Sequence, residues 1–180
     1  MSWSRVARRI RVPLGFVMAV LYLWLARPTW LWLVLGAMIA LGGVGLRAAA
    51  SGHIRKDSEL TTSGPYAYTR NPLYLGSIII ATGFAVAARS AWIVLAMAVL
   101  FAAIYWPVIL SEERYLRSSF PEFEAYAQRV PRLLPRLRAA EGGQGSFSRG
   151  LYLRHREYNA LLGTVAMIAA LVAKLLWPAR

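Results

Sequence analysis

The sequence has no cysteine, and this absence excludes disulfide bonds, thiolate metal ligands and cysteine nucleophiles. Histidine is also scarce, because His53 and His155 are the two in 180 residues and they have no ligand-like spacing. The sequence therefore predicts no metal site. It also lacks a Gly-x-Gly-x-x-Gly run after a strand and a phosphate-binding Gly-Lys-Ser/Thr loop, so no Rossmann-type or P-loop nucleotide domain is expected.

Acidic residues are few as well. The chain has 8 Asp and Glu residues against 21 Lys and Arg residues, which gives a formal net charge of +13. Charged residues of both signs nevertheless make up only 16% of the chain, whereas 58% of the residues are hydrophobic. With a mean hydropathy of +0.45, the chain is too apolar for an ordinary soluble domain of this size. The basic residues cluster outside long apolar runs, a pattern typical of cytoplasmic anchoring of membrane proteins and not of nucleic-acid binding.

Five apolar runs approach the roughly 20 helical residues that cross a bilayer core. They cover residues 12–26, 30–50, 74–88, 91–110 and 158–177. The sequence thus predicts an all-α, polytopic membrane bundle of about five transmembrane helices. Pro107 is expected to kink the end of the fourth run. The second run carries a small-residue face for close helix contact, formed by Gly36, Ala40, Gly42, Gly43 and Gly45.

Arginine and lysine predict the orientation of these spans. Most of them lie before the first run, between the second and third, and between the fourth and fifth, whereas the opposite side has Arg27, Arg89, Lys174 and Arg180. By the positive-inside rule, the N-terminus and both long polar connections lie in the cytoplasm and the C-terminus lies on the opposite side. The expected surroundings are membrane lipids, and the oligomeric state is left open.

Two polar segments on the predicted cytoplasmic side are expected to form defined structure and not only to connect the spans. They cover residues 51–73 and 111–137, and together with the first four spans they make a predicted membrane core over residues 1–137. Residues 138–150 are rich in Ala, Gly, Gln and Ser, which favours a flexible linker. Residues 151–180 then form a C-terminal transmembrane helix that is expected to be the most separable element.

The first segment ends in turn chemistry followed by the start of a membrane helix. Asn71 precedes Pro72, which favours an extended residue and then a helix N-terminus at the membrane surface. Backbone amides there, with Arg70, suit an anionic group such as a cofactor carboxylate. Tyr66 and Tyr74 offer aromatic faces for an adenine or a sulfonium. The alternative is a snorkelling arginine within an interfacial tyrosine belt.

In the second segment, two adjacent carboxylates follow the fourth apolar run. Glu112 and Glu113 at a membrane boundary need partners, for which an ammonium or a ribose hydroxyl would serve. The alternative is a pair of solvated or arginine-bridged carboxylates at a helix end. The apolar residues beyond them recur at helical spacing and are expected to pack over the site or lie on the bilayer. They are Leu116, Phe120, Phe123 and Tyr126.

Both segments carry the resemblance to a known family. The run from Gly52 to Gly76, with Gly52-His53-Ile54-Arg55-Lys56, Leu60 and the block from Gly64, resembles the isoprenylcysteine carboxyl methyltransferase and phospholipid methyltransferase family. The second signature is similar in Glu112-Glu113, Leu116, Phe120, Tyr126, Arg129-Val130-Pro131 and Pro135. The resemblance implies a membrane enzyme that binds S-adenosylmethionine on the cytoplasmic side and methylates a lipophilic small molecule or lipid.

Carried over by position, the resemblance also implies a set of site residues. The cofactor contacts are Ser58, Glu59, Leu60, Thr61, Tyr66, Asn71, Pro72, Leu73, Tyr74, Glu112 and Glu113, and the residues given a catalytic role are Arg70, Glu112 and Glu113. Two positions depart from the family pattern. Asn71 stands where a histidine is usual, and Val108 stands where the prenylcysteine enzymes carry an arginine that holds substrate. The second departure weakens the expectation of a prenylcysteine carboxylate as acceptor.

The acceptor and the need for a base stay open at this point. A carboxylate or thiolate acceptor needs no strong base, whereas an amine must lose a proton, for which Glu112, Glu113 or a tyrosine is available. Two rival functions remain. One is a membrane reductase that uses NADPH, because sterol reductases are similar in fold at their C-terminal ends. The other is a non-catalytic scaffold that keeps the cofactor pocket.

Overall fold

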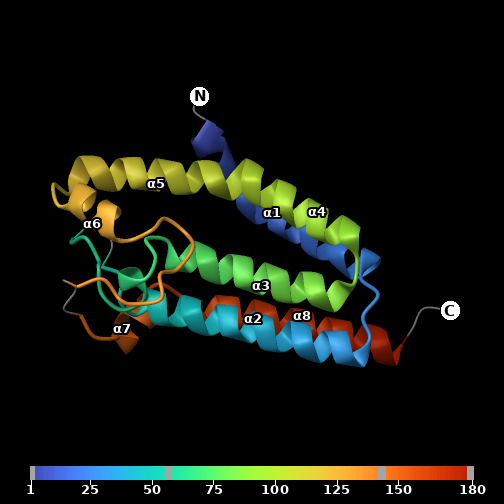
Figure 1. The fold of residues 1–180 in the computed structure, drawn as a ribbon. Coiled ribbons are helices and arrows are strands. Elements are labelled where there is room, and N and C mark those ends of the chain that lie inside the picture. Colours follow the sequence, from blue (N-terminus) through green and yellow to red (C-terminus); the bar gives the residue numbers. More distant parts are fainter. Residues whose placement is uncertain (1–2, 56–57, 142–144, 178–180) are drawn as a thin grey trace.

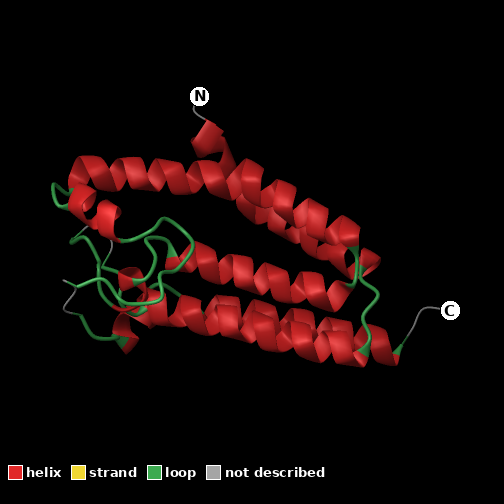
Figure 2. Cartoon of the chain, viewed as in Figure 1, coloured by secondary structure: helices red, strands yellow, loops and turns green. Residues whose placement is uncertain are grey.

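The computed structural model describes residues 3–55, 58–141 and 145–177, and the side chains from residue 13 onward. The α-helices are α1 (Trp3–Leu25), α2 (Trp30–Ser51), α3 (Pro72–Ala88), α4 (Ala91–Leu100), α5 (Trp106–Ser119), α6 (Phe123–Arg129), α7 (Arg149–Arg154) and α8 (Tyr158–Leu176). A 3-10 turn at Gly64–Ala67 and a π-helical segment at Phe101–Tyr105 complete the regular structure. No strand occurs among the described residues (Figure 2), so the predicted all-α class is confirmed.

Within the described residues, three helices are long and apolar enough to cross a membrane: α2, the continuous helix from Ala91 to Ser119, and α8. The other two predicted spans correspond to shorter apolar helices, Pro13–Leu25 within α1 and the whole of α3. Large apolar side chains are exposed along the helices, and Phe16 and Trp24 are 72% and 77% exposed. Such surfaces suit lipid and not water. The fold is therefore a helical membrane bundle.

The long helices form two layers that converge at one end (Figure 1). One layer contains α1 and the continuous helix α4–α5, and the other contains α2, α3 and α8. At the end remote from the polar segments, five helices supply buried residues to a common core, which includes Tyr22, Leu33, Ala87, Ile93 and Leu171. The hydroxyl of Tyr22 donates a 2.9 Å hydrogen bond to the carbonyl of Phe84. The layers are thus joined at one end, and the polar segments cover the other end.

Helices α2 and α3 make the most extensive contact in the bundle, and glycines allow it. A Cβ atom at Gly43 would lie 2.7 Å from the carbonyl oxygen of Gly76, and one at Gly36 would collide with the carbonyl oxygen of Gly83. The predicted small-residue face is confirmed at Gly36, Ala40 and Gly43, whereas Gly42 and Gly45 are exposed. This close approach places the C-terminal turn of α2 beside the first turn of α3, where the candidate site lies.

The fourth helix differs from its predicted bounds. We expected it to end near Leu110, but it continues to Ser119 and takes Glu112 and Glu113 into α5. The change from apolar to charged residues at Leu110 alters the surroundings of the helix without breaking it, because Ser, Glu, Arg and Leu all tolerate a helix. The break comes at Phe120, which is extended (φ −129°, ψ 109°) before Pro121. The expected disturbance near Pro107 takes the form of the π-helical segment that precedes it.

Residues of the predicted linker contact the first polar segment. The backbone N–H of Ala140 donates to the carbonyl of Ala67 (2.9 Å), and that of Ser148 donates to the carbonyl of Gly52 (2.8 Å). The ring of Phe147 lies edge-on to His53, with 6.2 Å between centroids. The described parts of residues 138–150 therefore follow the surface of the site. The division into core, linker and last helix stays a prediction.

Candidate functional site

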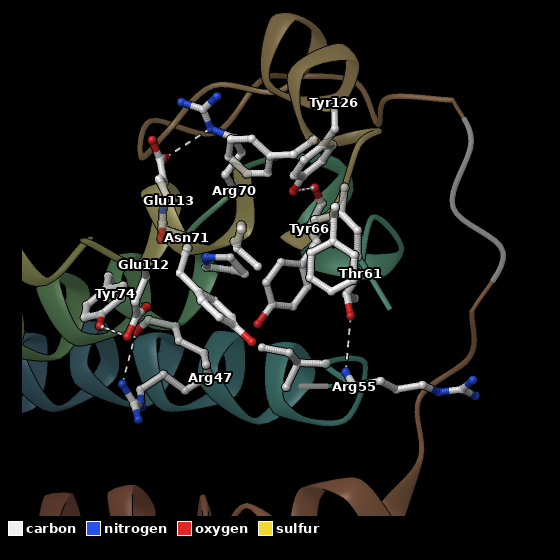
Figure 3. A pocket seen from close by; sticks show the side chains of 18 of the residues that line it. Arg47, Arg55, Thr61, Tyr66, Arg70, Asn71, Tyr74, Glu112, Glu113 and Tyr126 are labelled. Atoms are coloured by element: carbon white, nitrogen blue, oxygen red, sulfur yellow. Dashed lines mark hydrogen bonds and ion pairs between the residues drawn. The ribbon is translucent and has the colours of Figure 1, made fainter. Parts of the chain in front are cut away.

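A cavity of about 930 Å³ lies at the polar end of the bundle (Figure 3), near the upper end of the range of roughly 300–1,000 Å³ usual for small-molecule sites. Eleven of the twelve predicted site residues line it: Glu59, Leu60, Thr61, Tyr66, Arg70, Asn71, Pro72, Leu73, Tyr74, Glu112 and Glu113. Ser58 is the exception. It is exposed, and its hydroxyl donates to the carbonyl of Arg55 (3.2 Å). The fold thus brings the two polar segments into one site, and the roles of these residues remain predictions.

Glu113 is the buried centre of the wall that the two segments share. Its side chain is 4% exposed. Arg132 Nε donates to its Oε2 (2.9 Å), and Asn71 Nδ2 donates to its Oε1 (3.2 Å). Arg70 Nε also lies 3.2 Å from Oε1, an ion-pair contact without hydrogen-bond geometry. A carboxylate with this many partners positions other groups and has little capacity left for a ligand.

Asn71, which replaces the usual histidine, has a definite structural use. Besides Glu113, its amide nitrogen donates to the carbonyl of Arg132 (2.9 Å). Thr69 Oγ1 donates to the carbonyls of Arg132 (3.2 Å) and Leu133 (3.0 Å). An amide therefore ties the start of α3 both to α5 and to the loop after α6. Sequence reasoning left the role of this residue open, and the structure assigns it a hydrogen-bonding contact.

The loop after α6 is joined to the first segment by the backbone. Arg70 N–H donates to the carbonyl of Pro131 (2.9 Å), and Arg136 N–H donates to the carbonyl of Tyr68 (3.0 Å). The buried hydroxyl of Tyr126 donates to the carbonyl of Tyr66 (2.8 Å). Burial raises the pKa of Tyr126, the Arg70 charge lowers it and Glu113 raises it. These bonds hold the first and second segments in one unit.

Glu112 occupies a different environment from its neighbour. The hydroxyl of Tyr74 donates to its Oε1 (3.0 Å; Figure 3). The ring of Tyr74 in turn stands edge-on to Tyr105 in the π-helical segment, with 6.1 Å between centroids. Aromatic faces and a carboxylate thus lie together at the membrane side of the cavity, an arrangement that suits a cation. No sequence pattern pointed to Tyr105 as a site residue, although it lines the cavity.

Apolar residues of α6 and the segments around it form one wall of the cavity. The buried cluster of Phe123, Tyr126 and Val130 packs with partly buried Leu60, Leu116, Phe120, Ala127 and Ala140. All four members of the predicted stripe, Leu116, Phe120, Phe123 and Tyr126, line the cavity. The stripe therefore packs against the first segment as a cover, which was one of its two expected uses.

The charges that line the cavity are almost completely paired. Three arginines face four glutamates there. Arg70 pairs with Glu113, and the other two pairs are Arg47–Glu157 (2.8 Å) and Arg55–Glu59 (3.5 Å). Glu112 is the lining carboxylate without an ion-pair partner among the described residues. Glu113 has a second arginine neighbour in Arg132, so the charges of this network balance as a whole, and Glu112 is, within the described part of the chain, its one carboxylate without an arginine beside it.

One buried polar atom in the wall has no partner in the described chain. The hydroxyl of Tyr66 is buried and makes no hydrogen bond, although the residue is 6% exposed and lines the cavity. Burial raises the pKa of Tyr66, and the nearby charges of Tyr126, Glu112 and Glu157 add to the shift while Arg47 opposes it. A buried hydroxyl without a partner is unfavourable, so this atom is suited to a bound ligand.

Sequence reasoning missed several further polar residues of the lining, among them Arg47, Ser77, Glu157 and Asn159. Arg47 counted as one of many cytoplasmic anchoring charges, and the first turn of the last helix was set apart from the core. No local motif marks these residues, because they meet only through the packing of α8 on α2. The one sequence feature that could have pointed to this part of the site is Glu157, a single acidic residue directly after the basic stretch Arg154-His155-Arg156.

Three other residues singled out in the sequence lie outside the lining. His53 Nδ1 is 2.8 Å from the carbonyl of Ala49, and His155 Nδ1 is 3.1 Å from the carbonyl of Ser51. Both imidazoles thus contact the C-terminal carbonyls of α2. Val108 is buried in an apolar cluster with Ile104 that includes Tyr74. The position of the family's arginine is therefore filled here by a packing residue.

The chain is similar in sequence to known proteins, and the similarity includes segments that form the site. The profile of the phospholipid methyltransferase family matches residues 13–122. The cobalt-zinc-cadmium resistance protein CzcN of Cupriavidus metallidurans is 36% identical over 140 residues, which cover 73% of this chain and 64% of that protein. The nickel-cobalt-cadmium resistance protein NccN of Alcaligenes xylosoxydans xylosoxydans is 35% identical over 117 residues, covering 61% and 54%.

The chain spans 64% and 54% of the lengths of these two relatives. No solved structure matches it. The profile match covers α2, α3, α4 and α5 and most of α1, and so includes both the Arg70–Asn71 turn and the Glu112–Glu113 pair. This chain therefore belongs to the phospholipid methyltransferase family.

Proposed function

We propose that the protein is an S-adenosylmethionine-dependent methyltransferase that acts on a lipophilic acceptor in the membrane. The observation that carries the proposal is the charge of the cavity, in which each lining arginine is paired and Glu112 is not. S-adenosylmethionine is a net cation, with a sulfonium and an ammonium against one carboxylate. A site with one carboxylate that has no ion-pair partner and with neighbouring aromatic rings is complementary to such a molecule.

The same charge pattern argues against the reductase alternative. NADPH carries a pyrophosphate and a further phosphate, and proteins bind these groups with free arginine or lysine side chains and with backbone amides. Each lining arginine in the described part of the chain already has a carboxylate partner. Binding a polyanion would require breaking these pairs. The methyltransferase is thus the better fit to the cavity.

The residues present fit the cofactor in chemistry and in space. Tyr66 supplies a buried hydroxyl without a partner, and Glu112 supplies an acceptor for an ammonium or a hydroxyl. The backbone of residues 59–61 and the apolar cover are suited to the adenine ring. When bound, S-adenosylmethionine would supply an electrophilic methyl carbon. The chain's own work is to exclude water and to align the acceptor.

Glu112 is also the best-placed group to receive a proton from an amine acceptor. Glu113 is held by Arg132, Asn71 and Arg70, so it is not free to act. Tyr66 remains protonated at neutral pH, because burial raises the pKa of its hydroxyl. The two largely buried lining arginines, Arg47 and Arg70, already pair with carboxylates and are not free to bind an anionic acceptor. We therefore propose an acceptor without a negative charge at its reactive end, such as a lipid amine, in preference to a prenylcysteine carboxylate.

For the orientation, we propose that the cavity faces the cytoplasm, with the N-terminus on the same side and the C-terminus opposite. The distribution of arginine supports this arrangement, and the exposed apolar surfaces of the helices suit a surrounding bilayer, from which the acceptor would come. The names of CzcN and NccN refer to metal resistance. The described residues contain no group of three or more metal-ligating side chains, so we propose methyl transfer, and not metal binding, as the activity of this chain.

Two measurements on the purified chain in nanodiscs test the proposal. Isothermal calorimetry should show binding of S-adenosylhomocysteine and no comparable binding of NADPH. Incubation with methyl-tritiated S-adenosylmethionine and a total membrane lipid extract should then transfer label into the lipid. Binding without transfer would favour the non-catalytic scaffold, and absence of binding would overturn the proposal.

A further inference from the structure

Helix α8 begins in an unusual conformation beside the cavity. Arg156, which precedes the first residues of α8, has a positive φ of 54°, in the left-handed region that residues other than glycine rarely adopt. On its N-terminal side, His155 contacts the carbonyl of Ser51. On its C-terminal side, Glu157 meets Arg47. The strained residue thus lies between two side chains that attach this junction to α2, and such strain persists where the surroundings enforce it.

In the ion pair of Arg47 and Glu157, the arginine has no hydrogen-bonding capacity left for a ligand, and the glutamate has some. Arg47 Nε and Nη2 donate to the carboxylate at 2.8–3.0 Å. Its Nη1 donates to the carbonyl of Leu73 (3.0 Å) and to Ser77 Oγ (2.6 Å). Each of the three guanidinium nitrogens is therefore engaged within the protein, and Arg47 occupies three of the roughly four acceptor positions of the Glu157 carboxylate, so about one position remains. Arg47 holds Glu157, and Glu157 retains capacity toward the cavity that it lines.

The buried phenol of Tyr66 is the second observation at this place. Its hydroxyl has no partner, and Tyr66 lines the same cavity as Arg47, Glu112 and Glu157. An unpartnered hydroxyl in a cavity that two carboxylates also line makes a place for a ligand group that donates hydrogen bonds and can also accept one. Hydroxyl and ammonium groups have this chemistry.

We propose that Glu157, held in place by Arg47, is a ligand-contacting carboxylate that binds a hydroxyl or ammonium group beside the phenol of Tyr66. This proposal rests on the function proposed above and adds α8 to the site. Residues 158–176 and the glutamate before them lie beyond the segment that the family profile matches. The donor group belongs either to the cofactor or to the head of the acceptor, and these two sources give different results in the test below.

The test compares three variants of the full chain in nanodiscs. Glu157→Gln keeps the shape and a hydrogen bond to Arg47 but removes the charge. Arg47→Leu with Glu157→Leu replaces the whole pair by apolar residues, a change that folded proteins often tolerate. Glu124→Gln is the matched control, because Glu124 also pairs with an arginine, Arg117, at 2.9 Å but is exposed and outside the cavity lining.

The quantities measured are the Kd for S-adenosylhomocysteine and the lipid-extract concentration that gives half-maximal label transfer, with thermal unfolding as the check on folding. If Glu157 contacts the cofactor, Glu157→Gln and the double variant raise the Kd about tenfold. If it contacts the acceptor, the Kd is unchanged and the half-maximal lipid concentration rises about tenfold. The control changes neither quantity.

The proposal is overturned if both quantities stay within twofold of the unmutated protein in Glu157→Gln, or if the double variant restores them both. The second result would mean that the pair only attaches α8 to α2. If the double variant does not fold, Glu157→Gln decides alone. Failure of the unmutated protein to bind S-adenosylhomocysteine would instead remove the proposed function, and this inference with it.

Discussion

Asn71 and Glu113 lie 42 positions apart in the sequence and are joined by a 3.2 Å hydrogen bond between Nδ2 and Oε1. This bond connects the first turn of α3 to the middle of α5, and Arg132 adds the loop after α6 to the same carboxylate. Each of the three elements contributes to the cavity or supports its wall. The buried carboxylate of Glu113 is thus the point at which the two polar segments meet.

Replacing Glu113 by alanine should destabilise the protein strongly. The change leaves Arg70, whose side chain is 11% exposed, without its carboxylate, and removal of one partner from a buried ion pair costs about 3–5 kcal/mol. We expect a lower midpoint of thermal unfolding in detergent. The control is Glu124→Ala, which breaks an exposed pair and should cost about 0–1 kcal/mol. Equal effects of the two substitutions would contradict the central role of Glu113.

Glu112 should behave in the opposite way. Glu112→Gln removes the charge of the unpaired carboxylate but leaves the buried network around Glu113 intact, so we expect little change in thermal unfolding. A hydrogen bond to a charged group contributes about 1.5–3 kcal/mol. Its loss predicts that S-adenosylhomocysteine binds roughly ten- to a hundredfold more weakly. Calorimetry checks the affinity. Tyr74→Phe, which removes the hydrogen bond to Glu112, should give a smaller change in the same direction, and unchanged affinity in both variants would exclude Glu112 from the site.

The sequence allowed the helices and the two polar segments to be predicted for reasons that are local. Apolar runs mark membrane helices, and the step from Asn71 to Pro72 marks a helix start. The boundary at Leu110 was wrong because polarity changes there while helix propensity does not, and only Pro121 carries the stop signal. The helices and the polar segments were thus predictable because each depends on residues that are close together in the sequence.

The pair of Arg47 and Glu157 was not predictable by such means. The two residues are 110 positions apart, and their contact depends on how α8 packs against α2. That packing is decided by lipid-embedded apolar surfaces, which differ little from one membrane helix to another in sequence pattern. The resemblance to the family did not reach Glu157 either, because the matched residues end at 122.

The predicted orientation can be checked by reporter fusions. A reporter fused after Arg180 should lie on the side opposite the cytoplasm, and one fused after Gly143 should lie in the cytoplasm, since basic residues flank the N-terminal side of α8. Alkaline phosphatase and green fluorescent protein fusions report the two sides. Both reporters on one side would mean that α8 does not cross the membrane.

Adjacent glycines on α2 provide a test of the close helix contact that places Arg47 at the site. In Gly43→Ala, the new Cβ would lie 2.7–2.8 Å from backbone atoms of Gly76 and Ile80, which can yield only if the helices separate. Overpacking of this kind costs about 1–3 kcal/mol. Gly42→Ala is the matched control, because no atom lies within 4 Å of its Cβ and alanine favours a helix over glycine by about 0.5–1 kcal/mol.

We therefore expect Gly43→Ala to lower the midpoint of thermal unfolding and Gly42→Ala to leave it unchanged or raise it. The two variants should also differ in affinity for S-adenosylhomocysteine. Arg47 lies one helical turn beyond Gly43, and its side chain bonds to Leu73, Ser77 and Glu157, so separation of α2 from α3 displaces the wall of the cavity. A Gly43→Ala protein that melts and binds like the control would show that the two helices are not held this closely in the membrane.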